Sequence, residues 1–332
     1  MAIELAVGMV GAGYAAHRRA QAIRALKSGR VAVKGVFDVN ETHASEFARE
    51  LRVKHHRSLD ELLNDREINT IAVAVPNRFH YDIVKKGLLK NRHVLCEYPL
   101  VLDAYKTGEE LVGLAKKKGL FLHVGQTMNY DADYRFIEAH SKEIGEPLIG
   151  YRYLSFGPLG SWFTAEGFKG KYSGLGSWYV DHNVKRGWIV SSHYHGIQVF
   201  RKVFGEVVSV CAIDTSSAER ASASLLLRHE KGATTAIQWV MPAGGKVFNK
   251  TIVTGKEGSI EIEGDGYEID AGSTHNKGKL KAVDTFVIDL EVLLDELDGK
   301  RDIELEQRDM LRNLKTAICA QESAQRGRQV RV

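Results

Sequence analysis

The sequence contains few cysteines, and their positions argue against two kinds of protein. Cys96, Cys211 and Cys319 are the only three among 332 residues, and they lie far apart with no CxxC spacing. An odd number of scattered thiols argues against a disulfide framework and against a structural zinc site. We therefore expect a reducing compartment.

Long apolar runs and blocks of basic residues are also missing. No apolar stretch approaches the roughly 20 residues that a membrane-spanning helix needs, and the first residues lack the order of a signal peptide. The 46 Lys and Arg residues nearly balance the 42 Asp and Glu residues and are scattered along the chain. We therefore predict a cytoplasmic protein that binds neither nucleic acid nor a membrane.

The length and the local patterns predict two domains. Residues 1–126 alternate short apolar runs with helical patterns, which is typical of βαβ units and a doubly wound parallel sheet, the Rossmann fold of the α/β class. Strands are expected at residues 3–10, 31–38, 70–75, 93–97 and 121–124, and helices at residues 14–28, 41–51, 59–64, 80–89 and 104–118.

The pattern changes in residues 127–332, which predict an α+β domain with a largely antiparallel sheet. Strands are expected at residues 147–156, 206–215, 220–229, 233–241, 251–254 and 259–263, and helices at residues 133–144, 283–297 and 305–326. Residues 157–187 have no clear period, which indicates either a functional loop or a segment that the pattern does not resolve. Their aromatic residues either line a substrate cleft or pack the domain.

A glycine motif lies where a dinucleotide-binding fold requires one. The sequence GAGYAA follows the first predicted strand and opens the first predicted helix. Gly11 permits the tight turn, Gly13 lets a diphosphate approach the helix's positive end, and Ala16 allows helix and strand to pack closely. We predict that this segment, including Tyr14 and Ala15, binds a nicotinamide dinucleotide.

Asp38 ends the second predicted strand, at the spacing of about 20 residues that this fold uses for its ribose-binding carboxylate. A carboxylate there accepts hydrogen bonds from the ribose hydroxyls and repels a 2′-phosphate, which favours NAD over NADP. The alternative is an aspartate that caps the turn before the next helix.

Six segments together resemble the Gfo/Idh/MocA family of oxidoreductases over nearly the whole chain. They are GAGYAA, VPNRFH at residues 75–80, HVLCEYPL at 93–100, IGEP at 144–147, the stretch 195–205, and LDELDGKRDIELE at 294–306. The resemblance implies hydride transfer between NAD(P) and a small sugar, cyclitol or derivative at an alcohol or carbonyl carbon. It also implies an open second-domain sheet that buries its free face in a homodimer or homotetramer.

The chain departs from the family at the expected catalytic positions. Most members carry Glu-Lys-Pro and Asp-x-Gly-x-His; here Tyr98 replaces the lysine, Ser191 and His193 replace the aspartate and glycine, and His195 remains. A phenol is protonated at neutral pH, so it suits donation of a proton or hydrogen bond during reduction. We predict that Tyr98 and His195 surround the reacting oxygen, with Ser191 in the same hydrogen-bond network. His195 is also compatible with a core histidine.

Three further residues are candidate cofactor contacts. The resemblance places Asn77 and His80 beside the nicotinamide pocket, although the same residues are compatible with a helix start that Asn77 caps. Glu97 precedes Tyr98 at a strand end, where ligands of doubly wound folds bind, and Pro99 after it is compatible with a cis bond. We expect no metal site, because His182, His193 and their neighbours show no compact ligand spacing.

Two alternatives remain open. Glu-Tyr-Pro is also what biliverdin reductases carry at residues 97–99, and GYAAHRRA resembles the GYAAQRRA of their cyanobacterial members, which would place Arg18 and Arg19 near substrate or cofactor. Against this, the segment 123–130 does not match the corresponding run of those enzymes. Loss of the lysine and the aspartate also fits a non-catalytic dinucleotide-binding sensor.

Overall fold

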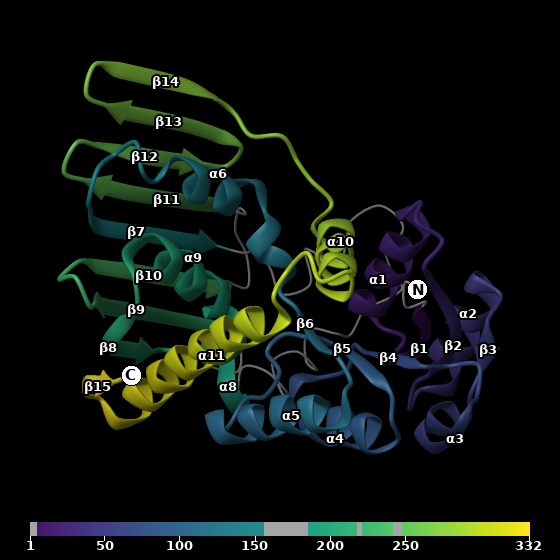
Figure 1. The fold of residues 1–332 in the computed structure, drawn as a ribbon. Coiled ribbons are helices and arrows are strands. Elements are labelled where there is room, and N and C mark those ends of the chain that lie inside the picture. The colour runs from purple at the N-terminus through teal and green to yellow at the C-terminus, as the bar shows by residue number, and fades with distance from the viewer. Residues whose placement is uncertain (1–4, 156–184, 218–220, 242–247) are drawn as a thin grey trace. The chain divides into compact units, whose positions relative to one another are not determined.

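A computed structural model describes residues 5–155, 185–217, 221–241 and 248–332 (Figure 1). The chain divides into two compact units. The first comprises Met1–Thr127 and Asp284–Leu311, and the second comprises Met128–Val283 and Arg312–Val332. Each unit contains its own sheet.

The first unit has a six-stranded parallel sheet in the order β3-β2-β1-β4-β5-β6. Its strands are β1 (Leu5–Val10), β2 (Val31–Phe37), β3 (Lys54–His55), β4 (Thr70–Val73), β5 (His93–Glu97) and β6 (Leu122–Gly125). The strand order reverses between β1 and β4, which is the point where doubly wound sheets bind their ligands. The structure confirms the predicted Rossmann sheet.

Five helices and one short 3₁₀ turn connect these strands, and side chains cap the starts of two of the helices. They are α1 (Tyr14–Ala25), α2 (Glu41–Leu51), α3 (Leu59–Asn64), α4 (His80–Leu89) and α5 (Tyr105–Lys118), with a short 3₁₀ turn η1 (Asn77–Phe79). The side chains of Asn40 and Ser58 accept backbone N–H bonds at the starts of α2 and α3. Gly119 ends α5 in the left-handed conformation that glycine favours.

Helix α10 (Thr285–Leu297) belongs to the first unit, although the sequence pattern assigns every residue after 126 to the second domain. Leu290 and Leu293 of α10 lie in one buried core with Ala16 and Ala20 of α1. The two helices pack together because small residues on α1 leave room for the leucines. Such a long-range pairing has no local sequence pattern that would reveal it.

The second unit has a nine-stranded, largely antiparallel sheet in the order β14-β13-β12-β11-β7-β10-β9-β8-β15. Among the described strands of this second sheet, only β7 and β10 pair in parallel. The strands are β7 (Pro147–Ser155), β8 (Val207–Asp214), β9 (Ala221–His229), β10 (Thr234–Met241), β11 (Phe248–Gly255), β12 (Gly258–Glu263), β13 (Gly266–Ala271), β14 (Thr274–Lys279) and β15 (Val330–Arg331). The structure confirms the predicted α+β architecture.

Helices cover one face of this sheet, and they are α6 (Ala132–His140), α8 (Lys185–Ser192), α9 (Tyr194–Phe204) and most of α11 (Ile303–Arg326) (Figure 1). Along β9, Leu225 and Leu227 are buried, whereas Leu226 between them is exposed. Ile213 of β8 and Ile149 of β7 are exposed as well. The sheet therefore presents apolar side chains on both of its faces.

The described residues include all three cysteines and the helices whose length and apolar character bear on membrane crossing. Cys96, Cys211 and Cys319 are all free thiols. Within the described parts of the chain, no helix combines the length and the apolar character that crossing a bilayer demands.

Candidate active site

The turn from β1 into α1 depends on Gly11. Its φ of +99° lies in the region that L side chains rarely adopt. A Cβ at this position would lie 2.3 Å from the carbonyl oxygen of Ala74, which follows β4. The loop can therefore run close to the neighbouring strand only with glycine at this position.

Gly13 leaves the start of α1 open. It precedes the helix in an extended conformation, and a Cβ built on it meets no atom within 4 Å. The helix begins without a side-chain cap and with no acidic residue in its first turn, which holds Tyr14 and Ala15. Ala16 is fully buried. Uncapped N–H groups at the positive end of a helix dipole form a site for an anion such as a diphosphate.

Asp38 joins this loop to the end of β2. Its Oδ2 accepts the backbone N–H of Ala12 at 2.7 Å, and its Oδ1 accepts that of Asn40 at 2.8 Å. The carboxylate therefore caps the turn before α2, and it also lies beside the glycine loop. Each oxygen has a further lone pair, so these bonds leave room for a ribose hydroxyl.

The turn at residues 97–99 follows β5, and the Tyr98–Pro99 bond is cis. His80 lies fully buried with Nδ1 2.8 Å from the Pro99 carbonyl oxygen and Nε2 2.9 Å from that of Val75. Burial lowers the pKa of His80. The ring thus links the ends of β4 and β5. Asn77 is the first residue of η1 and does not cap it, because Pro76 occupies that position.

Glu97 takes part in a buried ion-pair network that the sequence patterns do not reveal. Oε1 of Glu97 accepts hydrogen bonds from Arg19 Nε at 3.2 Å and Nη2 at 2.7 Å. The Nη1 of Arg19 donates to Asp289 Oδ2 at 2.5 Å. Arg19 therefore points into the first unit, and its partners there replace the substrate or cofactor contact that the resemblance implies. Arg18 lies 3.4 Å from Asp284.

His123 of β6 extends this network. Its Nδ1 lies 2.9 Å from Glu296 Oε2, and its Nε2 lies 3.3 Å from Asp289 Oδ1. Burial alone would lower the pKa of His123, but Glu296 and Asp289 outweigh it and raise that pKa to about 10. The ring is therefore an imidazolium at neutral pH. Burial opposes ionisation of Asp289 as well, yet Arg19 and His123 together lower its pKa.

In the second unit, His195 lies near the start of α9 and is fully buried. Its Nδ1 lies 3.4 Å from Asn129 Oδ1, and Asn129 Nδ2 donates to Gln198 Oε1 at 2.8 Å. Burial, with a smaller contribution from Arg152, lowers the pKa of His195 to about 3. The ring is neutral at physiological pH, which suits a hydrogen-bond partner better than an imidazolium acid.

Asp131 is a titratable group that belongs to none of the sequence motifs described above. It lies between η2 (Thr127–Tyr130) and α6. Burial and the neighbouring Asp133 raise its pKa to about 7, against the opposing charge of Arg152. Arg152 is itself buried and donates to Asp133 Oδ2 at 2.9 Å and to Thr251 Oγ1 at 2.7 Å. Asp131 can therefore gain or lose a proton near neutral pH.

Ser191 and His193 have partners within the second unit. The hydroxyl of Ser191 donates to the Trp188 carbonyl oxygen at 3.1 Å. His193 is buried, with Nδ1 2.7 Å from Ser192 Oγ and Nε2 3.2 Å from the Ala223 carbonyl oxygen. Burial lowers the pKa of His193 to about 4. His182 and the aromatic residues Trp162, Tyr172, Trp178 and Tyr179 lie outside the described residues.

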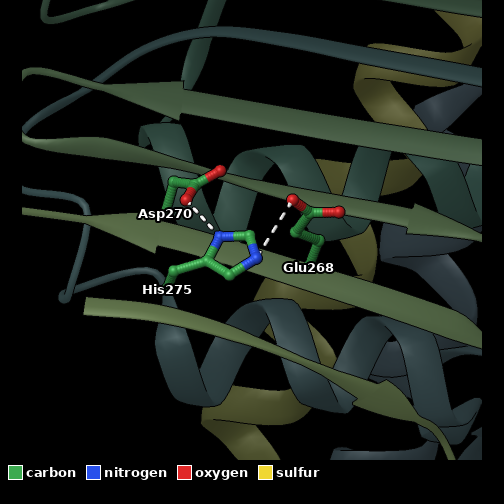
Figure 2. Close-up of side chains that lie close together, drawn as sticks. All are labelled: Glu268, Asp270 and His275. Atoms are coloured by element: carbon green, nitrogen blue, oxygen red, sulfur yellow. Dashed lines mark hydrogen bonds and ion pairs between the residues drawn. The ribbon is translucent and has the colours of Figure 1, made fainter.

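One group of metal-ligating types occurs among the described residues, on the exposed hairpin β13–β14 (Figure 2). His275 lies between two carboxylates, with Nδ1 2.6 Å from Asp270 and Nε2 3.6 Å from Glu268. Asp270 and His275 are direct cross-strand partners. The two carboxylates face different ring nitrogens, an arrangement typical of a surface ion-pair cluster rather than of ligands converging on one metal ion.

Comparison with known proteins identifies the first unit. The sequence model of the oxidoreductase family with an NAD-binding Rossmann fold, GFO_IDH_MocA, matches residues 5–126. Residues 5–126 therefore resemble the NAD-binding domain of the Gfo/Idh/MocA oxidoreductases. The match contains the glycine turn, Asp38 and the Glu97–Pro99 turn.

Three similar proteins show how far the likeness extends. UDP-N-acetylglucosamine 3-dehydrogenase of Acidithiobacillus ferrooxidans is 30% identical over 123 residues, or 37% of each chain. A biliverdin reductase from Synechocystis, solved with biliverdin and NADP+, has a TM-score of 0.82 at 23% identity and covers 97% of this chain and 99% of its own. An Agrobacterium radiobacter oxidoreductase, solved with NAD+, L-tartaric acid and magnesium, has a TM-score of 0.83 at 17% identity, covering 99% and 98%.

These likenesses support the family and the fold, but they do not identify a substrate. The matched segments span 22%, 40% and 37% of the first curated relatives. The two structural neighbours cover 97% and 99% of this chain, but at 23% and 17% identity they show the fold alone. The Gfo/Idh/MocA oxidoreductases among them carry different ligands, so these likenesses assign neither a substrate nor a direction of reaction.

Proposed function

We propose that this protein is an NAD(P)-dependent reductase of a small carbonyl-containing sugar, cyclitol or derivative. The uncapped start of α1 behind Gly13, at the β1/β4 switch point, is the observation that carries the proposal. Backbone N–H groups there would hold the diphosphate, and Gly13 leaves the space that a side chain would fill. A bound reduced nicotinamide would supply the hydride.

Tyr98 and His195 are the proposed residues around the reacting oxygen. The Tyr98 phenol would donate a proton or a hydrogen bond to the oxygen as the carbonyl carbon is reduced. A neutral His195 that donates from Nδ1 to Asn129 has a lone pair on Nε2, so it would accept a hydrogen bond from a substrate hydroxyl. Ser191 would act only indirectly, since its hydroxyl already bonds to Trp188.

We propose NAD as the preferred coenzyme, because the Asp38 carboxylate beside the glycine loop would repel a 2′-phosphate. Glu97 and His80 would support the nicotinamide end through the Tyr98 turn rather than contact it, given their buried partners. Asn77, half-buried at the start of η1, remains a proposed cofactor contact.

The test combines coenzyme binding with turnover. Wild-type protein should bind NADH more tightly than NADPH in calorimetry and oxidise it with a member of a panel of ketoses, inososes, imines and biliverdin. Tyr98→Phe and His195→Ala should bind coenzyme within about threefold of wild type yet lose at least about tenfold in kcat, because Tyr98 would donate to the reacting oxygen and His195 would hold a substrate hydroxyl in place. Equal turnover in both variants would remove these residues from the mechanism, and tighter NADPH binding would refute the coenzyme preference.

The same panel distinguishes two other candidate functions. Turnover of biliverdin alone would indicate a tetrapyrrole reductase, a possibility favoured by Tyr98 in the place of the usual lysine. Coenzyme binding without turnover of any compound would indicate a dinucleotide-binding sensor.

We also propose that the face of the second sheet opposite the described helices forms a homodimer or a homotetramer. Ile149, Ile213 and Leu226 are all more than half exposed on this sheet, and large apolar side chains exposed on one face are a feature of interaction sites. Sedimentation velocity at micromolar concentration should give a mass at least twice 36.9 kDa. Leu226→Glu should lower that mass, and a monomeric wild-type protein would contradict the proposal.

A further inference from the structure

We propose that Arg19 is a positioning residue for Tyr98, connecting the dinucleotide-binding helix to the turn that carries the phenol. The proposal rests on the proposed function in one respect, namely that Tyr98 acts on a substrate. The contacts that support it lie entirely within the first unit and involve α1, β5, β6 and α10.

Arg19 holds Glu97 at the end of β5. Arg19 donates from both Nε and Nη2 to one oxygen of Glu97, the last residue of β5. Nη1 of the same guanidinium binds Asp289 on α10, so Arg19 cannot rotate without breaking bonds on two elements. A planar guanidinium fixed at three nitrogens constrains its partner more than a lysine would. Since Glu97 is bonded to Tyr98, this constraint extends to the start of the turn.

His80 holds the other end of the turn. His80 contacts the Pro99 carbonyl oxygen at 2.8 Å, so residues 97–99 are held from both sides. Arg19 lies on α1, and the first turn of this helix is the proposed diphosphate site. That site lies less than two helical turns before Arg19 along the helix. The guanidinium therefore links the coenzyme site to the Tyr98 turn through one side chain.

Burying these charges costs desolvation free energy. The side chains of Arg19 and Asp289 are 1% and 0% exposed, and that of Glu97 is 14% exposed. Buried ion pairs add little net stability over well-packed apolar side chains, because desolvation of the charges offsets their attraction. Stability alone is therefore a weak explanation for the pair, whereas a fixed geometry at Tyr98 accounts for it.

Gly125 provides an independent way to disturb the network. A Cβ on Gly125 would lie 2.4 Å from Arg19 Nη2 and 3.3 Å from Asp289 Oδ2. The nearest atom is the far end of a flexible side chain, so Gly125→Ala should displace the guanidinium while keeping every charge in place. This variant tests position separately from charge.

The experiment measures Tyr98 directly and then turnover. Protein labelled with ¹³C at the tyrosine Cζ atoms would give a Tyr98 resonance that is identified by its loss in Tyr98→Phe. Arg19→Met and Gly125→Ala should shift this resonance and lower kcat at least tenfold, with KM and the NADH dissociation constant changed less than threefold. Arg19→Lys should lie between these variants and wild type.

Arg30→Met is the matched control, because Arg30 makes a two-bond pair with Asp298 in the same unit but away from the turn. It should leave the Tyr98 resonance and kcat unchanged. If folded Arg19→Met and Gly125→Ala match this control in both measurements, the positioning role is refuted. If Arg19→Met does not fold, Gly125→Ala and Arg19→Lys decide. If wild type turns over no compound, the proposed function fails, and the resonance alone still decides whether Arg19 positions Tyr98.

Discussion

Gly13→Ala should weaken NADH binding at least about tenfold while leaving the stability of the free protein unchanged. The new methyl group meets no atom within 4 Å, and Gly13 has a φ of −85° that alanine adopts readily. The folded domain therefore has room for it. A diphosphate on the N–H groups of α1 would need the same space, and losing one close backbone contact of that kind costs roughly 1.5–3 kcal/mol of binding. Calorimetry with NADH and thermal unfolding without it measure the two effects separately.

Gly11→Ala is the matched comparison, because the same methyl group there should destabilise the protein itself. It would lie 2.3 Å from the Ala74 carbonyl oxygen at a φ of +99°. Strain of this kind costs about 1–3 kcal/mol, so the midpoint of thermal unfolding should fall by several degrees. Unchanged NADH affinity in Gly13→Ala would show that the diphosphate does not lie at the start of α1, and the enzymatic proposal would lose its main support.

The sequence predicts the glycine turn well because the physical requirements there are local. A tight turn, an open helix start and a buried alanine are each set by one residue in GAGYAA, and the structure places Gly11, Gly13 and Ala16 accordingly. The alternation of apolar runs also predicts five strands of the first sheet, since strands buried on both faces are apolar throughout. It misses the edge strand β3, because Lys54–His55 is short and polar.

Features that depend on residues far apart in the sequence are not predictable in this way. Arg19 and Asp289 are 270 residues apart, and neither position carries a local pattern that marks a buried charge. The hairpin β13–β14 is missed for a different reason: the sequence THNKGK of β14 is exposed throughout, so it lacks the alternation that identifies a strand. The neutral state of His195 likewise follows from burial, which the sequence alone does not show.

His123→Gln should lower the free energy of unfolding by about 3–5 kcal/mol at pH 7, as is typical when one partner of a buried ion pair is removed. The imidazolium of His123 faces Glu296 and Asp289, and the variant removes the positive charge that this ring places beside the two carboxylates. His140→Gln is the control, because His140 pairs with Glu143 at the surface. Its effect should stay within about 0.5 kcal/mol. Urea unfolding followed by circular dichroism measures both.

The pH dependence gives this prediction a direction. The folded-state pKa of His123 is about 10, above the usual 6.5, so its stabilising contribution is complete below pH 6.5 and is lost as pH rises towards 10. Between these values the stability of wild type relative to His123→Gln should fall by up to about 1.4 kcal/mol per pH unit. Groups that titrate in both proteins cancel in the difference, so parallel pH curves would show that the ring is not held as an imidazolium.

A double variant separates the charge of His123 from its size. Glu296→Gln removes a carboxylate whose partner in the network is the His123 imidazolium. In wild type, Glu296→Gln should lower the free energy of unfolding, because His123 loses a counter-charge. In His123→Gln the same change should lower it by at least about 1 kcal/mol less, because the Glu296 carboxylate is then already buried without that partner. Additive effects would mean that His123 contributes by packing alone, and the network that holds Arg19, Asp289 and Glu97 would not depend on a charged ring.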